Sequence, residues 1–418
     1  MEQLPENMQA LVLANEERIL YTTVPCPRLI HSGDAIVRVT SCSICGSDLH
    51  PYHGREKGIA PNTIVGHEFV GIVVAKGPEV TGFELGDRVA SPFTSCCGSC
   101  FFCCKGAPCR CTHTQAHLFG WVSEGEEKLP PTERKGLQGS QAQYVRVPLA
   151  NGTLVKLPDD VSDEGGLLAG DILSTAFFCA KRGDVGEGAT VVVLGCGPVG
   201  LLCVIAAKHL HAGKVFAVDS VPERLAVARE LGAEPLTLQP PQHMALAPLN
   251  EQLLHQEQRE QLSASTASHA EAESENRQVA VIAAVMAATD GRGADCVLEA
   301  VGNNSALRLA YDLVRPMGTI SSVGVNTTSS FPFSPVDAYN KNITFRSGRC
   351  PARAYIARLL PLLREPQLPA QSSHCSDAAL PWRRILTHRL PLSKGPEAYD
   401  MFARRADGCI KIVLDPWT

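Results

Sequence analysis

At 418 residues the chain is too long for one compact core, which predicts two or three domains. A charged fraction of 19% and a net charge of −5 argue against a nucleic-acid-binding surface, which needs a clustered basic excess. The sequence shows neither a signal peptide nor an apolar run long enough to span a membrane, so we expect a cytoplasmic protein whose 17 cysteines are thiols and metal ligands rather than disulfides.

The first predicted elements are strands. Residues 10–160 alternate short Val/Ile-rich runs with glycine turns, which is typical of an antiparallel, barrel-like β domain. The runs are "DAIVRVTS", "HEFVGIVVAKG", "GDRVASP", "QAQYVRVP" and "GTLVKLP".

Residues 173–235 change to longer alternating units. A strand "ATVVVLG", a helix "PVGLLCVIAAKHL", a strand "KVFAVD" and a helix "PERLAVARELG" predict a βαβ pattern and a parallel sheet. The pattern resumes at "QVAVIAAVMAATDGRGADCVLEAVG" and "GTISSVGV". Between them, residues 240–277 are rich in Gln, Glu, Ala and Ser, which indicates a polar insertion in a surface loop, disordered or loosely helical. A shorter insertion, "EPQLPAQSSHCSDAALP", lies near the C-terminus.

Seven cysteines crowd into "CCGSCFFCCKGAPCRC", residues 96–111. Four of them have two, two and seven residues between them, a spacing that can wrap one tetrahedral zinc: Cys97, Cys100, Cys103 and Cys111. Four sulfurs close the metal shell, so this zinc would be structural. The alternatives are a chance cluster of thiols and a zinc-ribbon module, which usually pairs two more distant CxxC knuckles. Cys96, Cys104 and Cys109 receive no role, although Cys109 could compete with Cys111.

A second group of metal-ligand residue types lies in "SICGSDLHPYHG" and "IVGHEFVG". Cys45, His67 and Glu68 do not close a four-ligand set, and a catalytic zinc uses three protein ligands with one open position. Asp171 in "LLAGDILSTAF" offers a third ligand, which spacing alone does not select. Asp48 is a candidate for the carboxylate that hydrogen-bonds His67 on the side away from the metal and so orients its ring.

The stretch "VVVLGCGPVG" carries a GxGxxG motif between a predicted strand and helix. Gly195 allows the tight turn, Gly197 lets the backbone approach a pyrophosphate, and Gly200 lets the helix pack on the strand. Asp219 ends the next strand, where a carboxylate binds a ribose 2′-hydroxyl and repels a 2′-phosphate, so NAD is favoured over NADP. Arg224 lies either near the adenine or on a solvated helix face.

With these motifs the chain resembles the zinc-dependent medium-chain alcohol dehydrogenases, specifically their formaldehyde-dehydrogenase-like branch. The resemblance runs through nearly the whole chain except the two insertions. It includes "CGSDLH", "GHEFVG", the four cysteines, "GDILSTAF", "GCGPVG", "DSVPERL", "GRGADCVLEAVG", "SGRCPAR" and "DGCIKIVL". The fold implied is a GroES-like catalytic domain (residues 1–172 and 349–418) interrupted by a Rossmann NAD-binding domain (residues 173–348).

The resemblance also implies roles for single residues. Cys45, His67 and Asp171 resemble the ligands of the catalytic zinc, which with the four-cysteine site makes two zinc ions per subunit. Further implied roles are a proton relay through Ser47 and His50, an acidic neighbour of the metal at Glu68, a substrate-pocket wall at Phe93, a position beside the nicotinamide at Thr175 and one near the pyrophosphate at Lys411.

The activity implied is hydride transfer between NAD and an alcohol, aldehyde or ketone, in a homodimer or homotetramer. Relatives that use the glutathione adduct of formaldehyde usually carry Cys in place of Asp171 and a basic residue in place of Gly46, so we expect glutathione independence. His50 and His53 also resemble polyol dehydrogenases, which keeps a sugar-alcohol or formaldehyde dehydrogenase as an alternative. A non-catalytic dinucleotide-binding protein on the same fold is the alternative from another class.

Overall fold

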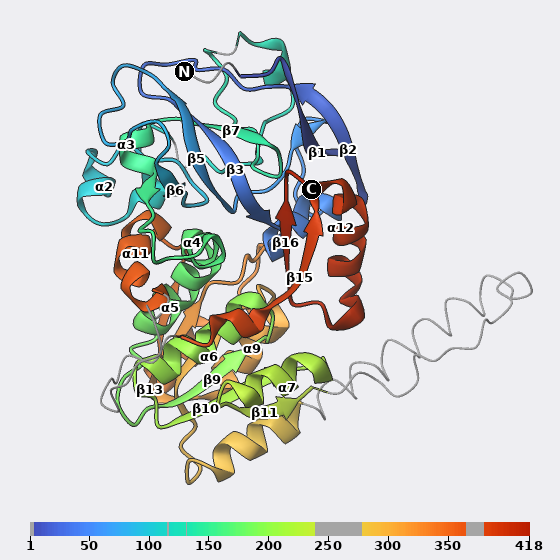
Figure 1. Cartoon of the computed structure of the whole chain (residues 1–418). Helices are drawn as coiled ribbons and strands as arrows, with labels where there is room; N and C mark the ends of the chain where they lie inside the picture. The colour runs from blue at the N-terminus through green and yellow to red at the C-terminus, as the bar shows by residue number, and fades with distance from the viewer. Residues whose placement is uncertain (1–3, 115–116, 131, 239–277, 365–379) are drawn as a thin grey trace, which may run out of the picture. The chain divides into compact units, whose positions relative to one another are not determined.

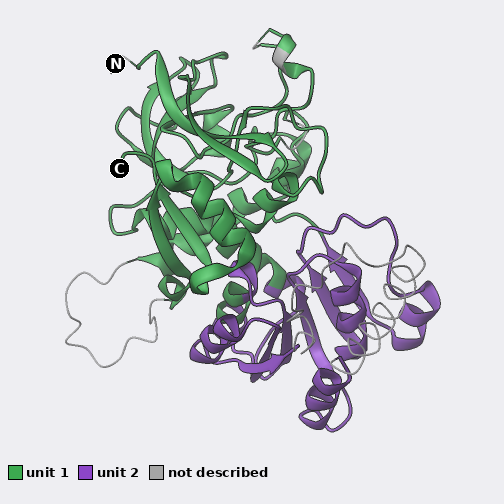
Figure 2. Ribbon diagram, turned by 90° about the vertical axis from the view of Figure 1, so that its right-hand side faces the viewer, with its two compact units in different colours: residues 1–179, 201–205, 348–418 green, residues 180–200, 206–347 purple. Residues whose placement is uncertain are grey.

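The computed structural model describes residues 4–114, 117–130, 132–238, 278–364 and 380–418. Contacts between residues divide the chain into two compact units, shown in separate colours in Figure 2. Unit 1 comprises residues 1–179, 201–205 and 348–418, and unit 2 comprises residues 180–200 and 206–347. By contacts, the first boundary lies after residue 179 and the C-terminal return begins at residue 348. The insertion predicted at 240–277 lies outside the described residues, as does most of the second one.

Unit 1 is built on two sheets. The larger has the order β15-β16-β3-β5-β6-β8, with β7 also paired to β3, and the smaller has the order β2-β1-β4. The strands are β1 (Asn7–Asn15), β2 (Arg18–Pro25), β3 (Ala35–Ser43), β4 (Thr63–Ile64), β5 (Phe69–Lys76), β6 (Arg88–Ala90), β7 (Tyr144–Val147), β8 (Val155–Lys156), β15 (Leu386–Pro391) and β16 (Lys411–Asp415). Two details differ from the expectation of an antiparallel domain. The pair β15–β16 is parallel, and "GTLVKLP" begins in the short helix α3 (Ala150–Thr153) before β8.

The register of three strands explains how distant residues of unit 1 meet. β3 pairs antiparallel with β5 so that Cys42 faces Phe69, and β16 pairs antiparallel with β3 so that Leu414 also faces Cys42. The end of β3 therefore lies beside the start of β5 and beside Val413 and Leu414 of β16, and Figure 1 shows β3 between these two strands. Buried apolar side chains from all three strands, such as Val37, Phe69 and Leu414, pack in one core beneath this point.

Helices complete unit 1. They are α1 (Leu49–Tyr52), α2 (Phe101–Cys104), α3, α4 (Asp163–Gly170), α5 (Ile172–Arg182, which continues into unit 2), α11 (Ala352–Leu359) and α12 (Gly395–Arg404). Ser162 caps α4 by accepting a hydrogen bond from the backbone N–H of Gly165. Asp171 is the single residue between α4 and α5, with φ −143° and ψ −83°. The helical path is interrupted at Asp171, because these angles are not those of a helix.

Unit 2 is a parallel sheet with the order β11-β10-β9-β12-β13-β14. Its strands are β9 (Thr190–Leu194), β10 (Lys214–Asp219), β11 (Glu234–Thr237), β12 (Ala294–Glu299), β13 (Val314–Ser322) and β14 (Thr344–Ser347). Its helices include α6 (Pro198–His209), α7 (Pro222–Glu230), α9 (Asn304–Leu313) and α10 (Pro335–Lys341), and residues 278–287 are also helical. Counted within the unit, the order is 3-2-1-4-5-6, that of the dinucleotide-binding fold.

The predicted class, a β-rich domain with a doubly wound parallel-sheet domain, is therefore confirmed. The predicted strands and helices between residues 189 and 232 are also confirmed within two residues at their ends. None of the described helices has both the length and the apolar character that crossing a bilayer requires.

Candidate metal and cofactor sites

The end of β3 and the start of β5 bring together the first two candidate metal ligands. Cys45 follows β3 and His67 precedes β5, so the antiparallel register makes them neighbours. Asp171 reaches the same point from the break between α4 and α5. The Cys45 Sγ, a His67 ring nitrogen and an Asp171 carboxylate oxygen all lie within 4.8 Å of one another, and all three residues are buried.

The spacing of these three groups fits a zinc ion. The distance from Cys45 Sγ to Asp171 Oδ2 is 3.5 Å, and that from His67 Nε2 to Asp171 Oδ2 is 3.2 Å. A tetrahedral zinc with bonds of about 2.0–2.3 Å spaces its ligand atoms about 3.3–3.5 Å apart. A thiolate and a carboxylate also match the two charges of the cation. Three ligands leave one position for a substrate oxygen, the arrangement of catalytic rather than structural zinc.

The ionisation of these groups is strongly perturbed. Burial alone would lower the pKa of His67, but the Asp48 carboxylate and the hydrogen bond with Asp171 hold that pKa well above its ordinary value. Burial, reinforced by the charges of Glu68 and Asp171, raises the pKa of the Cys45 thiol. Burial opposes ionisation of Asp171, yet its hydrogen bond and ion pair with His67 lower its pKa. A metal ion must displace the protons on His67 and Cys45, so its binding releases protons.

Two polar side chains hold the ligands in place. The Asp48 Oδ1 lies 3.0 Å from the His67 Nδ1, which fixes the ring and leaves Nε2 facing the metal position. The Ser47 Oγ lies 3.3 Å from the Cys45 Sγ and 3.2 Å from the His67 Nε2. Ser47 thus lies beside two of the three candidate ligand atoms.

Lys411 is not where it was expected. Its side chain is fully buried inside unit 1, where the Nζ pairs with the Glu68 carboxylate and donates to the Ile44 carbonyl at 2.9 Å. The Ser43 Oγ donates to the same carboxylate at 2.7 Å. An ammonium so enclosed cannot reach a cofactor pyrophosphate, so that expectation is corrected. Sequence reasoning missed this pairing, because only the register of β16 on β3 brings Lys411 to Glu68.

Three further residues were predicted at the reaction site, and the structure gives each of them different contacts. The Phe93 ring is buried and meets the His67 ring edge-on at 6.4 Å, as a pocket wall beside the metal would. The Thr175 Oγ1 donates to Asp171 Oδ1 at 3.3 Å. The His50 Nδ1 is buried without a hydrogen-bond partner, and no hydrogen bond among the described residues joins His50 to Ser47.

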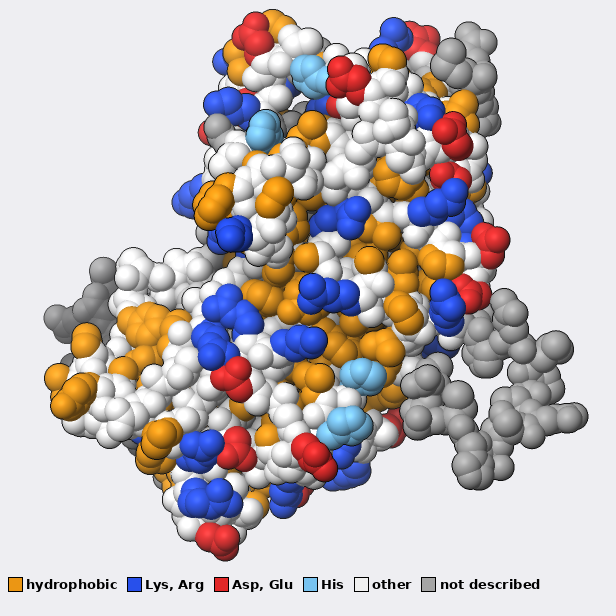
Figure 3. All heavy atoms as spheres, turned by 90° about the vertical axis from the view of Figure 1, so that its left-hand side faces the viewer, with side chains coloured by type: hydrophobic (Ala, Val, Ile, Leu, Met, Phe, Trp, Pro, Cys, Tyr) orange, Lys and Arg blue, Asp and Glu red, His pale blue; other side chains and the backbone are white. Residues whose placement is uncertain are grey.

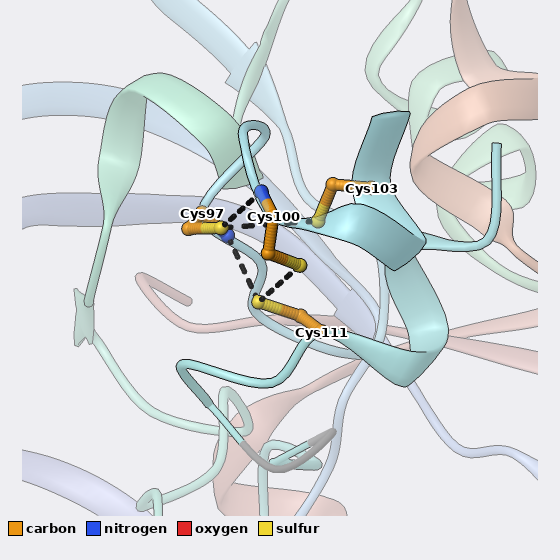
Figure 4. Close-up of side chains that lie close together, drawn as sticks. All are labelled: Cys97, Cys100, Cys103 and Cys111. Atoms are coloured by element: carbon orange, nitrogen blue, oxygen red, sulfur yellow. Dashed lines mark hydrogen bonds between the residues drawn. The ribbon is translucent and has the colours of Figure 1, made fainter. Parts of the chain in front are cut away.

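The four spaced cysteines form a separate cluster, drawn in Figure 4. The Cys97 and Cys103 sulfurs lie 4.0 Å apart and the Cys100 and Cys111 sulfurs 3.9 Å apart, close to the roughly 3.8 Å expected around a tetrahedral zinc. Backbone N–H groups of Cys103 and Thr112 lower the pKa of the Cys100 thiol to about 5, whereas burial and the hydrogen bond with Cys100 raise the pKa of the Cys103 thiol.

The leftover cysteines are not part of this four-sulfur set, although Cys96 packs against Cys100 and Cys111. Cys96 and Cys109 are buried, and their thiols donate to the carbonyls of Gly152 and Arg349. Cys104 is exposed. The structure places Cys111, and not Cys109, with the other three sulfurs.

The glycine motif of unit 2 occupies the turn between β9 and α6. Gly195 has a φ of +85°, and a Cβ on Gly200 would lie 1.6 Å from the Gly195 carbonyl oxygen, so both positions require glycine. A Cβ on Gly197 would meet no protein atom closer than the Arg224 Nη1 at 3.8 Å. Protein packing therefore does not explain Gly197, whereas close approach of a phosphate at the start of α6 does.

Asp219 ends β10 and lies against this turn. Its Oδ2 accepts a hydrogen bond from the Cys196 N–H at 2.6 Å, and its Oδ1 accepts from the N–H groups of Ser220 and Val221. The carboxylate is thus fixed beside the turn, where the ribose of a bound dinucleotide lies in this fold. The turn and Asp219 therefore fit a dinucleotide cofactor.

Comparison with known proteins finds similarity to zinc-type alcohol dehydrogenases in both sequence and structure. Residues 31–159 match the alcohol dehydrogenase GroES-like domain, and residues 254–365 match the zinc-binding dehydrogenase family. Zinc-type alcohol dehydrogenase B of Aspergillus flavus is 35% identical over 401 residues, which cover 94% of this chain and 78% of that protein. An uncharacterized zinc-type alcohol dehydrogenase-like protein of Bacillus subtilis is 31% identical over 424 residues, covering 98% of this chain and all of that protein. The solved alcohol dehydrogenase TADH from Thermus sp. ATN1 is 36% identical, with a TM-score of 0.77 and coverage of 98% and 99%.

Proposed function

The chain belongs to the zinc-type medium-chain alcohol dehydrogenase family of oxidoreductases, and we propose that it transfers a hydride between an alcohol and NAD without glutathione. The observation that carries the proposal is the convergence of Cys45, His67 and Asp171 on one buried point with Ser47 beside it. A non-catalytic protein on the same fold would have no use for three buried metal ligands with an open fourth position.

Cys45, His67 and Asp171 would hold the catalytic zinc. When bound, zinc supplies a Lewis acid that lowers the pKa of an alcohol at its open position. Ser47 lies within 3.3 Å of two ligand atoms, so its hydroxyl can accept the alcohol proton. His50 is the next acceptor, reached through a water or a ligand hydroxyl that bridges the gap to Ser47. Phe93 shields the reacting carbon from water.

We propose two zinc ions per subunit, the second held by Cys97, Cys100, Cys103 and Cys111. We further propose that NAD, not NADP, is the cofactor, because the Asp219 carboxylate repels a 2′-phosphate. Arg224 lies beside Gly197 and would contact the adenosine side of the dinucleotide. Thr175, which contacts Asp171, is our candidate for a nicotinamide neighbour.

The branch and the substrate class form a finer proposal. Two residues support a glutathione-independent member of the formaldehyde-dehydrogenase-like branch. One is Asp171 as the third ligand, and the other is Gly46, where a Cβ would meet no protein atom within 4 Å. The polyol alternative gains no support from His53, because its Nδ1 is paired with Glu17 at 2.9 Å.

The proposed partners are a small alcohol or aldehyde and further copies of this chain. Figure 3 shows acidic and basic side chains on the same face, which supports a small-molecule substrate rather than nucleic acid. Four exposed apolar side chains of unit 2 lie on or near β13 and α10 and support a homodimer or homotetramer: Met317, Phe331, Val336 and Tyr339. The cytoplasmic location is a proposal that rests on the number of cysteines.

The direct test is a substrate panel with purified protein. NAD and NADP reduction is followed with formaldehyde, primary alcohols, secondary alcohols and polyols, each with and without glutathione. The proposal expects NAD reduction that glutathione does not stimulate and that a zinc chelator abolishes. Metal analysis showing zinc in the protein but no turnover on any substrate class would favour the non-catalytic alternative.

A further inference from the structure

A buried glutamine packs directly behind the metal ligand His67. Gln141 is fully buried, and its backbone N–H donates to the Val65 carbonyl at 3.0 Å. A Cβ on Gly66 would lie only 2.4 Å from the Gln141 Cγ. Gln141 therefore covers the backbone immediately before His67, so closely that only glycine fits between them.

The side-chain amide of Gln141 has defined partners on both ends. Its Nε2 donates to the Ser43 carbonyl at 3.0 Å and to the Asp48 Oδ2 at 3.3 Å. Its Oε1 accepts from the Tyr399 hydroxyl at 3.0 Å. A carbonyl and a carboxylate can only accept, so the nitrogen must face them and the orientation of the amide is determined.

Asp48 is the link between this amide and the metal site. Its Oδ1 holds the His67 Nδ1 at 3.0 Å, while its Oδ2 accepts from the Cys45 N–H at 2.9 Å and from Gln141. One carboxylate thus touches two metal-ligand residues and is held from behind by Gln141. The hydrogen bonds run without interruption from α12 to the metal position, in the order Tyr399, Gln141, Asp48, His67.

Tyr399 anchors the far end of this chain. It is fully buried on α12, in the C-terminal return, and its ring lies 5.5 Å from that of Tyr52. Neither Tyr399 nor Gln141 is hydrogen-bonded to Cys45, His67 or Asp171 among the described contacts. The hydrogen bond to Asp48 is the one that links the Gln141 amide to the candidate ligands His67 and Cys45, while Gln141 also donates to the Ser43 carbonyl and packs on Gly66.

We propose that Gln141 and Tyr399 are positioning residues that pre-orient Asp48, and through it His67, for the catalytic zinc. The inference rests on the proposed function, since it assumes a zinc on Cys45, His67 and Asp171. Groups that fix the orientation of a metal-binding histidine typically change metal affinity about 10- to 100-fold when removed. Without Gln141, the Asp48 Oδ2 keeps only the Cys45 N–H, and the carboxylate is free to turn away from His67.

The test compares Gln141→Met, Tyr399→Phe and the double variant with the unaltered protein. Met keeps the length of Gln and Phe keeps the ring of Tyr, so each change removes hydrogen bonds rather than shape. Gln143→Met is the matched control. Gln143 lies two residues from Gln141, and its side chain also makes two hydrogen bonds, but with Gln9 and Pro416 rather than with Asp48. Zinc per subunit is measured by metal analysis after equilibration at a series of buffered zinc concentrations.

The catalytic zinc should dissociate at about tenfold higher free zinc in Gln141→Met than in the unaltered protein, while the four-cysteine zinc stays bound. Tyr399→Phe should shift in the same direction by a smaller factor, and the double variant should equal Gln141→Met, since Tyr399 acts through Gln141. Gln143→Met should not shift.

If Gln141→Met and Tyr399→Phe both bind two zinc ions with unchanged affinity, this inference is wrong and the proposed function stands. Joint loss of both zinc ions, or unfolding in both variants, would show a merely structural role and also contradict it. An unaltered protein that holds no zinc on Cys45, His67 and Asp171 would overturn the proposed function and this inference together.

Discussion

The Lys411 ammonium and the Glu68 carboxylate form an ion pair in which neither side chain is exposed to solvent. The pair joins the strand β16 to the residue that follows His67, a candidate metal ligand. It therefore ties the C-terminal return segment to the candidate metal site.

Replacing Lys411 by Met should destabilise the fold, because it leaves the Glu68 carboxylate buried without its cation. Breaking a buried pair in this way typically costs about 3–5 kcal/mol. Urea unfolding measures the loss. The control is Lys394→Met, whose partner Glu397 lies at the surface and where about 0–1 kcal/mol is expected. Weaker NAD binding with unchanged stability would instead restore the pyrophosphate role of Lys411.

Cofactor choice should depend on the charge of Asp219. Asp219→Asn keeps the shape and part of the hydrogen bonding to the turn, but removes the charge that repels a 2′-phosphate. The ratio of kcat/KM for NAD to that for NADP should fall by about tenfold or more, as expected for about 1.4 kcal/mol. Asp219→Ala should weaken NAD further, since it also removes the acceptor. An unaltered protein that already prefers NADP would refute this account of Asp219.

The fall of kcat for alcohol oxidation at low pH, the acid limb of the pH profile, should reflect protonation of His50. Burial, and then the nearby cations Arg55 and His53, lower the pKa of His50 from its ordinary value of 6.5. The neutral ring is the proton acceptor, so a lowered pKa keeps it active to lower pH, and kcat should fall only below pH 6.5. Arg55→Gln should move that limb to higher pH, because it removes one opposing cation. His50→Gln should abolish the limb and slow turnover, and a profile unchanged in His50→Gln would exclude the relay.

The four-cysteine cluster should contribute to stability rather than to chemistry. Cys100→Ser removes one of four thiolates from a closed metal shell, so the protein should lose one zinc per subunit and melt at a lower temperature. Cys104→Ser is the control, because the exposed Cys104 is outside the cluster. Differential scanning calorimetry with metal analysis compares the two. An equal effect of both changes would show that the cluster does not bind metal.

Local patterns in the sequence predict much of the fold and part of the sites. The alternation of strands and helices after residue 189 predicts the parallel sheet, and the spacing of Cys97, Cys100, Cys103 and Cys111 predicts their cluster, because neighbours in sequence fold locally. Asp171 could not be selected by spacing, since the break between α4 and α5 alone brings it to His67. Here the resemblance supplied what the pattern could not.

Residues that depend on long-range register were the hardest to predict. The resemblance implied a place near the pyrophosphate for Lys411, and a lysine near the C-terminus gives no sign in the sequence of which way its amine points. The register of β16 on β3 sends it inward to Glu68. Gln141 and Tyr399 are single polar residues in otherwise apolar surroundings, and no periodicity indicates that they meet each other. Their pairing follows only from the folded chain.

The central claim is that Cys45, His67 and Asp171 hold the zinc that carries the reaction. The most direct test is zinc content and turnover in Asp171→Asn, which removes an anionic ligand but keeps its shape. The account predicts that zinc falls from about two per subunit towards one, and that turnover falls by about 10- to 100-fold or more, while the fold and NAD binding survive. An Asp171→Asn protein that keeps both zinc ions and normal turnover would contradict it.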